Sequence, residues 1–237
     1  MLDTAGKLLR EAKAITVLTG AGVSAESGVP TFRGPGGLWK QFRPEDLATP
    51  QAFRRAPELV WEWYDWRRGV IANIKPNPAH YALAELEERV PRFTLITQNV
   101  DGLHQQAGSK TVLEVHGSIW TLRCTACGRT WGDRSIPLAL PPRCECGSLA
   151  RPGVVWFGEN LPVKVWTAAE EATRSSDVFL VVGTSAVVYP AAGLVPLARA
   201  AGAKTIEINL EATPMSSSVD YALTGAAGEI LPRILQA

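Results

Sequence analysis

The sequence predicts an α/β fold in which parallel strands alternate with helices. Apolar, strand-like runs at 14–19, 93–97 and 178–182 are each followed at once by glycine or polar residues, and helical patterns lie between them. Strands that alternate with helices form a parallel sheet covered on both faces. In such sheets ligands bind at the carboxyl ends of the strands, where each polar motif of this chain falls. We therefore expect a ligand site along one edge of the sheet.

The composition is that of a folded globular protein. The chain has 237 residues, of which 46% are hydrophobic and 20% charged, and its formal net charge is +1. This length suits one large domain, or one domain with a smaller insert. The charge balance gives no reason to expect direct binding to nucleic acid or membrane. The N-terminus resembles an amphipathic helix and not a signal peptide, so a cytoplasmic location is expected.

The first half of the chain predicts three helices around the first strand. Residues 3–13 have an amphipathic pattern, and residues 57–74 place apolar side chains at helical spacing. The sequence Lys75-Pro76-Asn77-Pro78 ends that second helix, and a third follows over 79–90. The Pro- and Gly-rich run 30–37 is expected to be a loop, of the kind that often covers a ligand.

The later strands are predicted from short apolar runs. In chain order they are 93–97, 111–115, 154–157, 178–182 and 205–209. The cysteine-containing segment, about 121–152, interrupts the alternation and is interpreted as an inserted zinc module. Val154-Val155-Trp156-Phe157 is expected to resume the strands after it.

Four cysteines predict a structural zinc site. All of them lie within one short segment, as two closely spaced pairs: Cys124, Cys127, Cys144 and Cys146. In a chain without a secretion signal, such pairs favour zinc over disulfides. Four protein thiolates leave the metal no open position, so no catalytic role is expected for it. Reduced, metal-free cysteines are the alternative.

A glycine-rich turn follows the first strand. Gly20-x-Gly22-x-x-Ala25 fits the relaxed dinucleotide fingerprint, in which backbone approaches a phosphate closely. The usual acidic ribose ligand about 20 residues further on is missing, because Glu45 and Asp46 follow a loop. Glu211, after the strand at 205–209, is the better candidate for the adenosine ribose.

The best candidate for a catalytic base is His116. It lies between the strand-like run 111–115 and Gly117, at the end of an element, and the polar run Gln98-Asn99-Val100-Asp101 follows the strand at 93–97. A buried structural histidine is the alternative. His80 is expected to be a surface or packing residue, and His104 to be local structure. The tryptophans at 61, 63 and 66 are expected to pack in the core or an interface.

The order of these motifs resembles the sirtuin family. The segments that carry the resemblance are Gly20 through Gly34, Thr97 through Asp101, His116-Gly117-Ser118, the cysteine pairs, Trp156-Phe157-Gly158-Glu159 and Gly183-Thr184-Ser185. The resemblance covers nearly the whole chain, about residues 14 to 232. Tyr64-Asp65-Trp66-Arg67 is most similar to the Tyr-x-x-Arg of the class III, desuccinylase-like branch.

The resemblance implies a Rossmann-type large domain with a smaller inserted domain that combines a helical segment with the zinc module. The expected division assigns 1–40, 76–120 and 153–237 to the NAD-binding domain, and 41–75 and 121–152 to the small domain. NAD and acyl-lysine would meet between the two. Acyl transfer to the ribose would release nicotinamide, O-acyl-ADP-ribose and free lysine.

The resemblance also implies roles for individual residues. His116 would be the general base on the ribose hydroxyls, and Asn99 would order the ribose and a nearby water. Asp101 would bind the nicotinamide carboxamide. The NAD-binding set would comprise Gly20, Ala21, Gly22, Ser24, Ala25, Glu26, Thr31, Phe32, Arg33, Trp39, Gln98, Asn99, Val100, Asp101, Gly183, Thr184, Ser185, Asn209, Leu210, Glu211 and Ala227.

The acyl-lysine substrate would be held by a second set of residues. Gly158 and Glu159 would pair with the peptide as an added strand, next to Val155 and Phe157. Tyr64 and Arg67, three apart on one helix face, would clamp an acyl carboxylate. Without the resemblance, they would be a packed tyrosine under a solvated arginine.

Three functions are therefore weighed. The resemblance favours an NAD-dependent protein deacylase acting on succinyl and acetyl groups. A mono-ADP-ribosyltransferase would expel nicotinamide in the same way but use another nucleophile. A non-catalytic NAD- and zinc-binding module would not need His116, Asn99 and Asp101. The protein substrates, the acyl preference and the oligomeric state are not predicted by the sequence.

Overall fold

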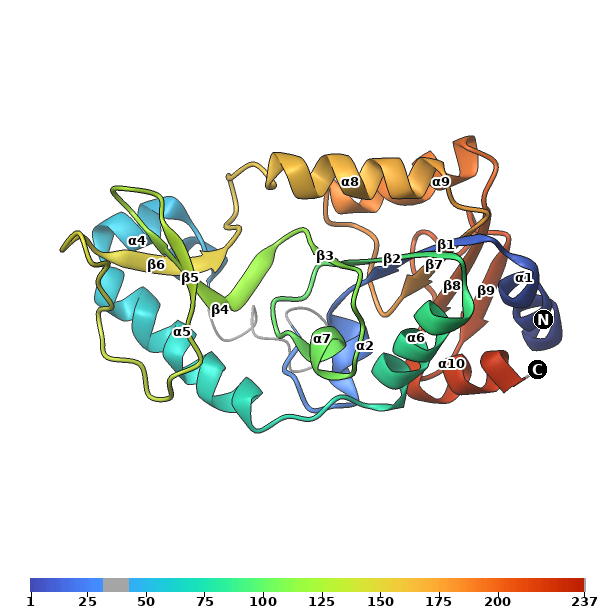
Figure 1. The fold of residues 1–237 in the computed structure, drawn as a ribbon, viewed down its shortest axis with the longest axis horizontal. Helices are drawn as coiled ribbons and strands as arrows, with labels where there is room; N and C mark the ends of the chain where they lie inside the picture. The colour runs from blue at the N-terminus through green and yellow to red at the C-terminus, as the bar shows by residue number, and fades with distance from the viewer. Residues whose placement is uncertain (32–42, 237) are drawn as a thin grey trace.

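The fold is built on a six-stranded parallel sheet. The computed structural model describes residues 1–31 and 43–236. The strand order is β3-β2-β1-β7-β8-β9, and every neighbouring pair is parallel. The sheet lies toward one end of an elongated molecule, close to both termini (Figure 1). Its strands are β1 Ala14–Thr19, β2 Arg92–Thr97, β3 Val112–Glu114, β7 Val178–Val182, β8 Lys204–Asn209 and β9 Tyr221–Thr224.

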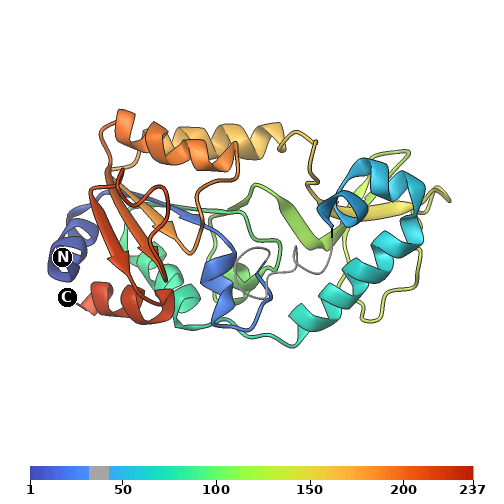
Figure 2. The ribbon, with the colours of Figure 1, turned by 180° about the vertical axis from the view of Figure 1, so that it is seen from behind.

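Helices cover both faces of this sheet. One face packs against α1 (Leu2–Glu11), α6 (Pro78–Arg89) and α10 (Ala227–Gln236), and the other packs against α8 (Val163–Arg174) and α9 (Leu194–Ala200). The view from behind shows these two layers on opposite sides of the strands (Figure 2). Alternate residues of β7 supply the two cores, because successive side chains of a strand point to opposite faces. Leu180 belongs to one core cluster, and Phe179 and Val181 to the other.

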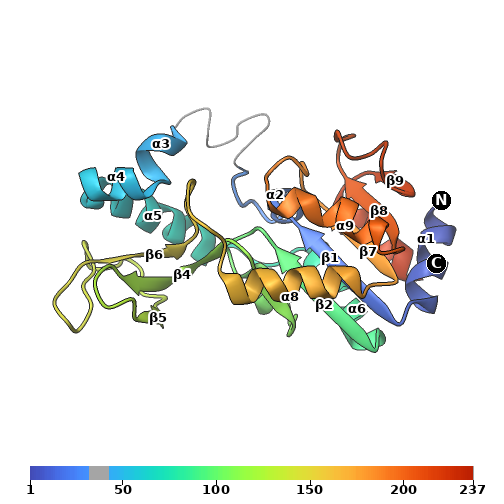
Figure 3. The same ribbon diagram turned by 90° about the horizontal axis from the view of Figure 1, so that it is seen from above.

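A second, smaller sheet forms the other end of the molecule. Its order is β5-β4-β6 and both of its strand pairs are antiparallel. It packs with the helices that precede α6, and Figure 3 shows these elements grouped apart from the large sheet. The elements of this part are α3 Pro44–Leu47, α4 Pro50–Arg55, α5 Pro57–Ala72, β4 Gly117–Cys124, β5 Thr130–Gly132 and β6 Ala150–Val154.

The predicted fold class is confirmed, with one strand misplaced. The strands expected at 14–19, 93–97, 178–182 and 205–209 all belong to the parallel sheet. The expectation that Val154–Phe157 resumes the strands is wrong: β6 ends at Val154 and pairs with β4 in the small sheet. The chain then turns, because Trp156 N donates to the Glu159 carboxylate (2.9 Å) and Gly158 has a φ of 84°.

Three further short helices complete the described part of the chain: α2 Ala21–Ala25, α7 Leu103–Gln106 and the 3-10 turn Ala191–Gly193. Within residues 1–31 and 43–236, no helix combines the length and apolarity needed to cross a bilayer. The exact division of the chain into a large and a small domain stays a prediction.

Candidate functional site

A large cavity lies where the carboxyl ends of the parallel strands face the small sheet. Its volume is about 660 Å³. The turns after β1, β2, β7 and β8 line it on one side, and α5 and the segment after β6 line it on the other. Most of the predicted NAD-binding residues are in its wall: Gly20, Ala21, Gly22, Ala25, Glu26, Thr31, Gln98, Asn99, Val100, Gly183, Thr184, Ser185, Asn209, Leu210, Glu211 and Ala227.

The first glycines are required by the close packing of two strand-end turns. A Cβ at Gly20 would lie 2.7 Å from the Thr184 side chain, and one at Gly22 would lie 2.7 Å from the Gly183 carbonyl oxygen. Gly22 N donates to that same oxygen at 2.7 Å, and Gly183 itself has a φ of 59°. Only residues without a side chain let the turns after β1 and β7 meet in this way. The two predicted cofactor motifs therefore form one continuous wall.

A buried network holds the loop after β2. Asn99 Nδ2 donates to the Gly20 carbonyl (3.0 Å) and to Ser24 Oγ (3.2 Å). The Asp101 carboxylate accepts from Ser24 Oγ (2.9 Å) and from Leu103 N (2.9 Å). Burial raises the pKa of Asp101, while these donors act to lower it. Ser24 therefore connects Asn99 to Asp101, and together with Gly20 it sets the position of Asn99.

His80 belongs to this network, although the sequence predicted only a surface or packing role. It is fully buried, and its Nδ1 accepts from Asn77 N at 3.3 Å. The proton must then be on Nε2, which lies 3.2 Å from Ser24 Oγ and donates to it. Burial lowers the pKa of His80 to about 4, so the imidazole is neutral at physiological pH. The signal available in the sequence was the spacing of Asn77 and His80 at the start of a helix. His80 lies at the third position after the N-cap Asn77 and completes the capping box of α6.

His104 is also buried, next to His80. Its Nε2 lies 3.0 Å from Thr19 Oγ1, and the two imidazole centroids are 4.8 Å apart. Burial lowers the pKa of His104 well below its usual range. Its contacts stay within the fold, in agreement with the local role expected for it.

His116 lies in the cavity wall with a defined tautomer. Its Nδ1 is 3.1 Å from the Gln98 carbonyl oxygen, which can only accept, so Nδ1 carries the proton. Nε2 is then the unprotonated nitrogen and can take a proton from a ligand. Burial lowers the pKa of His116, and the bond to Gln98 opposes this. Such a histidine is available as a base at neutral pH.

Tyr64 and Arg67 line the same cavity from α5. Both side chains are buried, at 3% and 6% exposed. Tyr64 Oη accepts from Trp156 Nε1 at 2.9 Å, which leaves the hydroxyl hydrogen for another acceptor. The Arg67 guanidinium lies over the Trp63 ring, 4.9 Å from its centroid. Burial lowers the pKa of Arg67, so an incoming anion would stabilise its charged form.

The segment after β6 forms the rim of the cavity beside these two residues. Val155, Phe157, Gly158 and Glu159 all line it, as predicted for the substrate. The Glu159 carboxylate is engaged internally, because it pairs with Arg151 at 2.6 Å. Its contribution to a ligand would therefore come from the main chain.

Two of the predicted NAD-binding residues, Ser24 and Asp101, do not line the cavity. Phe32, Arg33 and Trp39 lie outside the described residues. Glu45 and Asp46, passed over as ribose ligands because they follow a loop, do not line the cavity. Both lie on α3 within 4.0 Å of the Arg43 guanidinium, and Asp46 also pairs with Arg55 at 2.9 Å. Glu211 does line it, as expected.

Part of the cavity wall was not predicted from the sequence. The additional lining residues are Ala48, Trp63, Val154, Trp156, Leu161, Val187, Val188, Tyr189, Pro190, Ile208, Ala212, Thr213, Pro214 and Ala226. Most are apolar and continue a motif already recognised. Extending Gly183-Thr184-Ser185 by a few residues would have found the run from Val187 to Pro190.

The four cysteines form a separate cluster in the small sheet. Their Sγ atoms all lie within 4.8 Å of one another, and no described disulfide joins them. Amide donors from Cys127 and Ala126 point at Cys124 Sγ. These bonds, that of Cys127 first, and the neighbouring thiols together lower the pKa of Cys124 to about 6. Four convergent sulfurs with amide donors fit a tetrahedral zinc ion.

Comparison with known proteins agrees with this arrangement. Residues 20–190 match the model of the Sir2 family. The chain is 55% identical over 230 residues to a protein of Pyrobaculum aerophilum named NAD-dependent protein deacylase 2, covering 97% of this chain and 92% of that one.

Solved structures are similar over almost the whole chain. A Sir2 homologue in complex with NAD has a TM-score of 0.93 and 50% identity, covering 98% of this chain and 92% of its own. Sir2Af2 bound to a myristoylated histone peptide has a TM-score of 0.80 and 39% identity, covering 99% and 94%.

Proposed function

Because this chain belongs to the Sir2 family, we propose that it is an NAD-dependent protein-lysine deacylase that removes succinyl as well as acetyl groups. Deacylase activity is supported by the name of its relative from Pyrobaculum aerophilum. An acyl-lysine peptide as substrate is supported by the relative bound to a myristoylated histone peptide. NAD would be consumed as a co-substrate, since it provides the ribose to which the acyl group passes.

The observation that carries this proposal is the single cavity shared by three groups of residues. The glycine turns after β1 and β7, the base His116, and the pair Tyr64 and Arg67 all line it. A dehydrogenase would need no such base beside a cation-lined acyl pocket. A non-catalytic module would gain nothing from a histidine whose tautomer leaves a proton acceptor in the cavity.

His116 and Asn99 are the proposed catalytic residues. Nε2 of His116 would take the proton from a ribose hydroxyl, while its Nδ1–H stays bonded to Gln98 O. Asn99 is fixed by Gly20 and Ser24, so its own position is independent of the ligand. Such a preorganised base contributes about 10²–10⁴ to a rate.

The remaining cofactor-binding roles follow the positions of the residues. Gly20, Gly22 and Gly183 would let the two turns approach the pyrophosphate closely because they lack side chains, while their own N–H groups stay bonded within the fold. Asn209 and Glu211 would bind the adenosine end, where Asn209 Nδ2 already supports the Thr184 carbonyl at 3.0 Å. Asp101 would bind the nicotinamide carboxamide, and Phe32, Arg33 and Trp39 remain proposed contacts outside the described residues.

Arg67 and Tyr64 would recognise the end of a succinyl group. Arginine offers a planar fork that matches a carboxylate, and the tyrosine hydroxyl adds a third donor. An acetyl group carries no charge and needs neither residue. The cysteine cluster would hold one structural zinc, without a role in the reaction.

The test is to assay matched acetyl-, succinyl- and unmodified-lysine peptides with NAD, with products identified by mass spectrometry. A deacylase yields free lysine and O-acyl-ADP-ribose. ADP-ribose attached to protein would instead indicate the transferase, and no NAD turnover would indicate a binding module. A cytoplasmic location also remains a prediction, and four cysteines that form no disulfide with one another suit a reducing compartment.

A further inference from the structure

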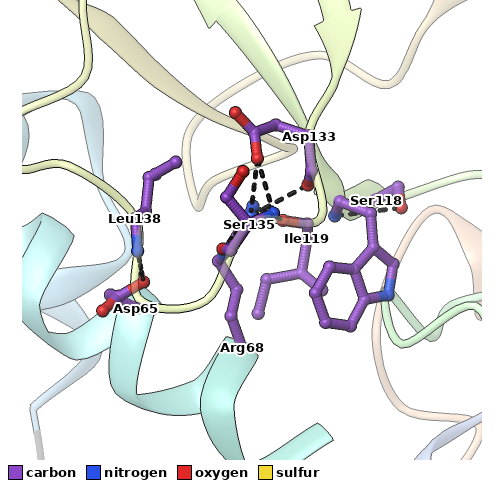
Figure 4. Close-up of polar contacts among 8 residues, drawn as sticks. Asp65, Arg68, Ser118, Ile119, Asp133, Ser135 and Leu138 are labelled. Carbon is purple, nitrogen blue, oxygen red and sulfur yellow. Dashed lines mark hydrogen bonds and ion pairs between the residues drawn. The ribbon is translucent and has the colours of Figure 1, made fainter. Parts of the chain in front are cut away.

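The face of α5 next to Tyr64 and Arg67 is anchored to a loop of the cysteine-containing module. Asp65 and Arg68 each follow one of the cavity residues, and they are turned about 100° from them around the helix. They do not line the cavity. Both instead contact residues 133–138, which lie between the two cysteine pairs (Figure 4).

Arg68 makes an unusually dense set of contacts for a charged side chain. It is fully buried, and its Nη1 donates to Ile119 O at 3.0 Å. Its Nη2 donates to the carbonyl oxygens of Asp133 (2.8 Å) and Ser135 (3.1 Å), and it lies 3.4 Å from the Asp133 carboxylate. Only a guanidinium can reach several acceptors at once from one plane. These bonds hold α5 against both β4 and the loop.

Asp65 adds a second attachment three residues earlier. Its Oδ1 accepts from Leu138 N at 3.0 Å. The loop is itself ordered, because Asp133 Oδ1 accepts from Ser135 N at 2.7 Å. Two attachments about one helical turn apart restrict both the rotation of α5 about its axis and its displacement along that axis.

The nicotinamide side of the site is linked to Arg68 through Trp120, but it also has supports that do not involve α5. The Arg68 guanidinium also lies over Trp120, 5.3 Å from its ring centroid, and Trp120 Nε1 donates to the Asp101 carbonyl at 2.6 Å. The Asp101 carboxylate, however, is held by Ser24 and Leu103. Loosening α5 should therefore disturb the acyl pocket more than the chemistry at the ribose.

We propose that Asp65 and Arg68 are positioning residues for acyl-carboxylate recognition. They fix the rotation of α5, so that Tyr64 and Arg67 converge at one place in the cavity. This inference rests on the proposed function of Tyr64 and Arg67. A bidentate carboxylate contact tolerates only about 0.5 Å of error, whereas a methyl group needs no directed bond. Loss of the attachment should therefore lower desuccinylation selectively.

The experiment compares Asp65→Ala with Asp65→Asn, together with Arg68→Lys. Both Asp65 variants remove the negative charge, but asparagine keeps an Oδ1 acceptor for Leu138 N. Lysine at 68 keeps the charge but cannot reach all the carbonyl groups. Leu86→Ala, in the core of the large domain, controls for general destabilisation. The kcat and KM for succinyl- and acetyl-lysine peptides are measured in each variant, with zinc content and Tm.

We expect Asp65→Ala and Arg68→Lys to lower the succinyl-to-acetyl ratio of kcat/KM by about tenfold, mainly through a higher KM for the succinyl peptide. A tenfold loss corresponds to a displacement of Tyr64 and Arg67 by less than ~1 Å, because a misplacement of that size can cost about 10²-fold in rate. Asp65→Asn and Leu86→Ala should leave the ratio within about twofold of the parent, because asparagine keeps the acceptor for Leu138 N and Leu86 packs in the core of the large sheet, away from α5.

Two outcomes would overturn the inference: equal losses on both peptides in Asp65→Ala and Arg68→Lys, or equal ratios in Asp65→Ala and Asp65→Asn. Arg67→Met separates this failure from failure of the proposed function. If Arg67→Met leaves the ratio unchanged, the acyl-carboxylate role of Arg67 is wrong. If it lowers the ratio and the Asp65 and Arg68 variants do not, only the positioning role is wrong.

Discussion

Replacing Arg67 with methionine is expected to reduce desuccinylation by more than tenfold and to leave deacetylation largely intact. Arg67 is only 6% exposed, so a carboxylate that meets it is shielded from water. A hydrogen bond to a charged group contributes about 1.5–3 kcal/mol, and about 1.4 kcal/mol corresponds to tenfold in rate. Loss of one such bond therefore predicts a fall of about 10- to 150-fold in kcat/KM for the succinyl peptide.

Methionine is chosen because it keeps the packing. The Arg67 guanidinium lies over Trp63 at 4.9 Å, and the flexible thioether of methionine can occupy the same surface. Burial already lowers the pKa of Arg67, so removing the cation relieves an unfavourable desolvation in the free enzyme. Deacetylation should therefore persist or improve slightly, since an acetyl group makes no use of the charge.

The assay measures kcat/KM for succinyl- and acetyl-lysine versions of one peptide, in the parent, in Arg67→Met and in Tyr64→Phe. Tyr64→Phe removes one hydroxyl and should lower desuccinylation less than Arg67→Met does. A parallel loss on both peptides would mean that Arg67 supports the fold and does not recognise the acyl group. An unchanged succinyl rate would remove the residue from substrate recognition altogether.

Three further predictions concern the base, the metal and pH. His116→Tyr should abolish removal of every acyl group in a folded protein, because His116 provides the proposed base; more than a tenth of parental activity would contradict this. Cys124→Ser or Cys144→Ser should lose the single zinc and unfold the small module, since structural zinc contributes folding free energy directly; metal analysis and Tm measure this, and full activity in metal-free protein would refute it. The free energy of unfolding should fall by up to about 3 kcal/mol as pH drops from about 6.5 to about 4. The reason is that His80, with a native pKa of about 4, stays neutral in the fold but is protonated in the unfolded chain. Urea titrations of the parent and His80→Asn across this range test it, and equal pH dependence in the two proteins would exclude His80 as the source.

The sequence by itself determined the parallel sheet and most of the candidate site. The strands at 14–19, 93–97 and 178–182 were predictable because their apolar runs are continuous, as buried parallel strands require. Their polar motifs follow immediately, so the shared edge of the sheet brings them together without further information. The cysteine cluster was likewise predictable, because the two pairs are local and their chemistry is specific.

Only the tertiary structure decided which residues meet across distant segments. Val154 and its neighbours have the composition of a strand in either sheet, and the turn at Glu159 assigns them to the small one. Nothing local distinguishes Arg68, fully buried among carbonyl groups, from the solvated arginine that its helix position also permits. A buried polar side chain is defined by its partners, and those of Arg68 lie more than 50 residues away along the chain. The same holds for His80, which contacts Ser24 only because α6 packs beside the turn after β1.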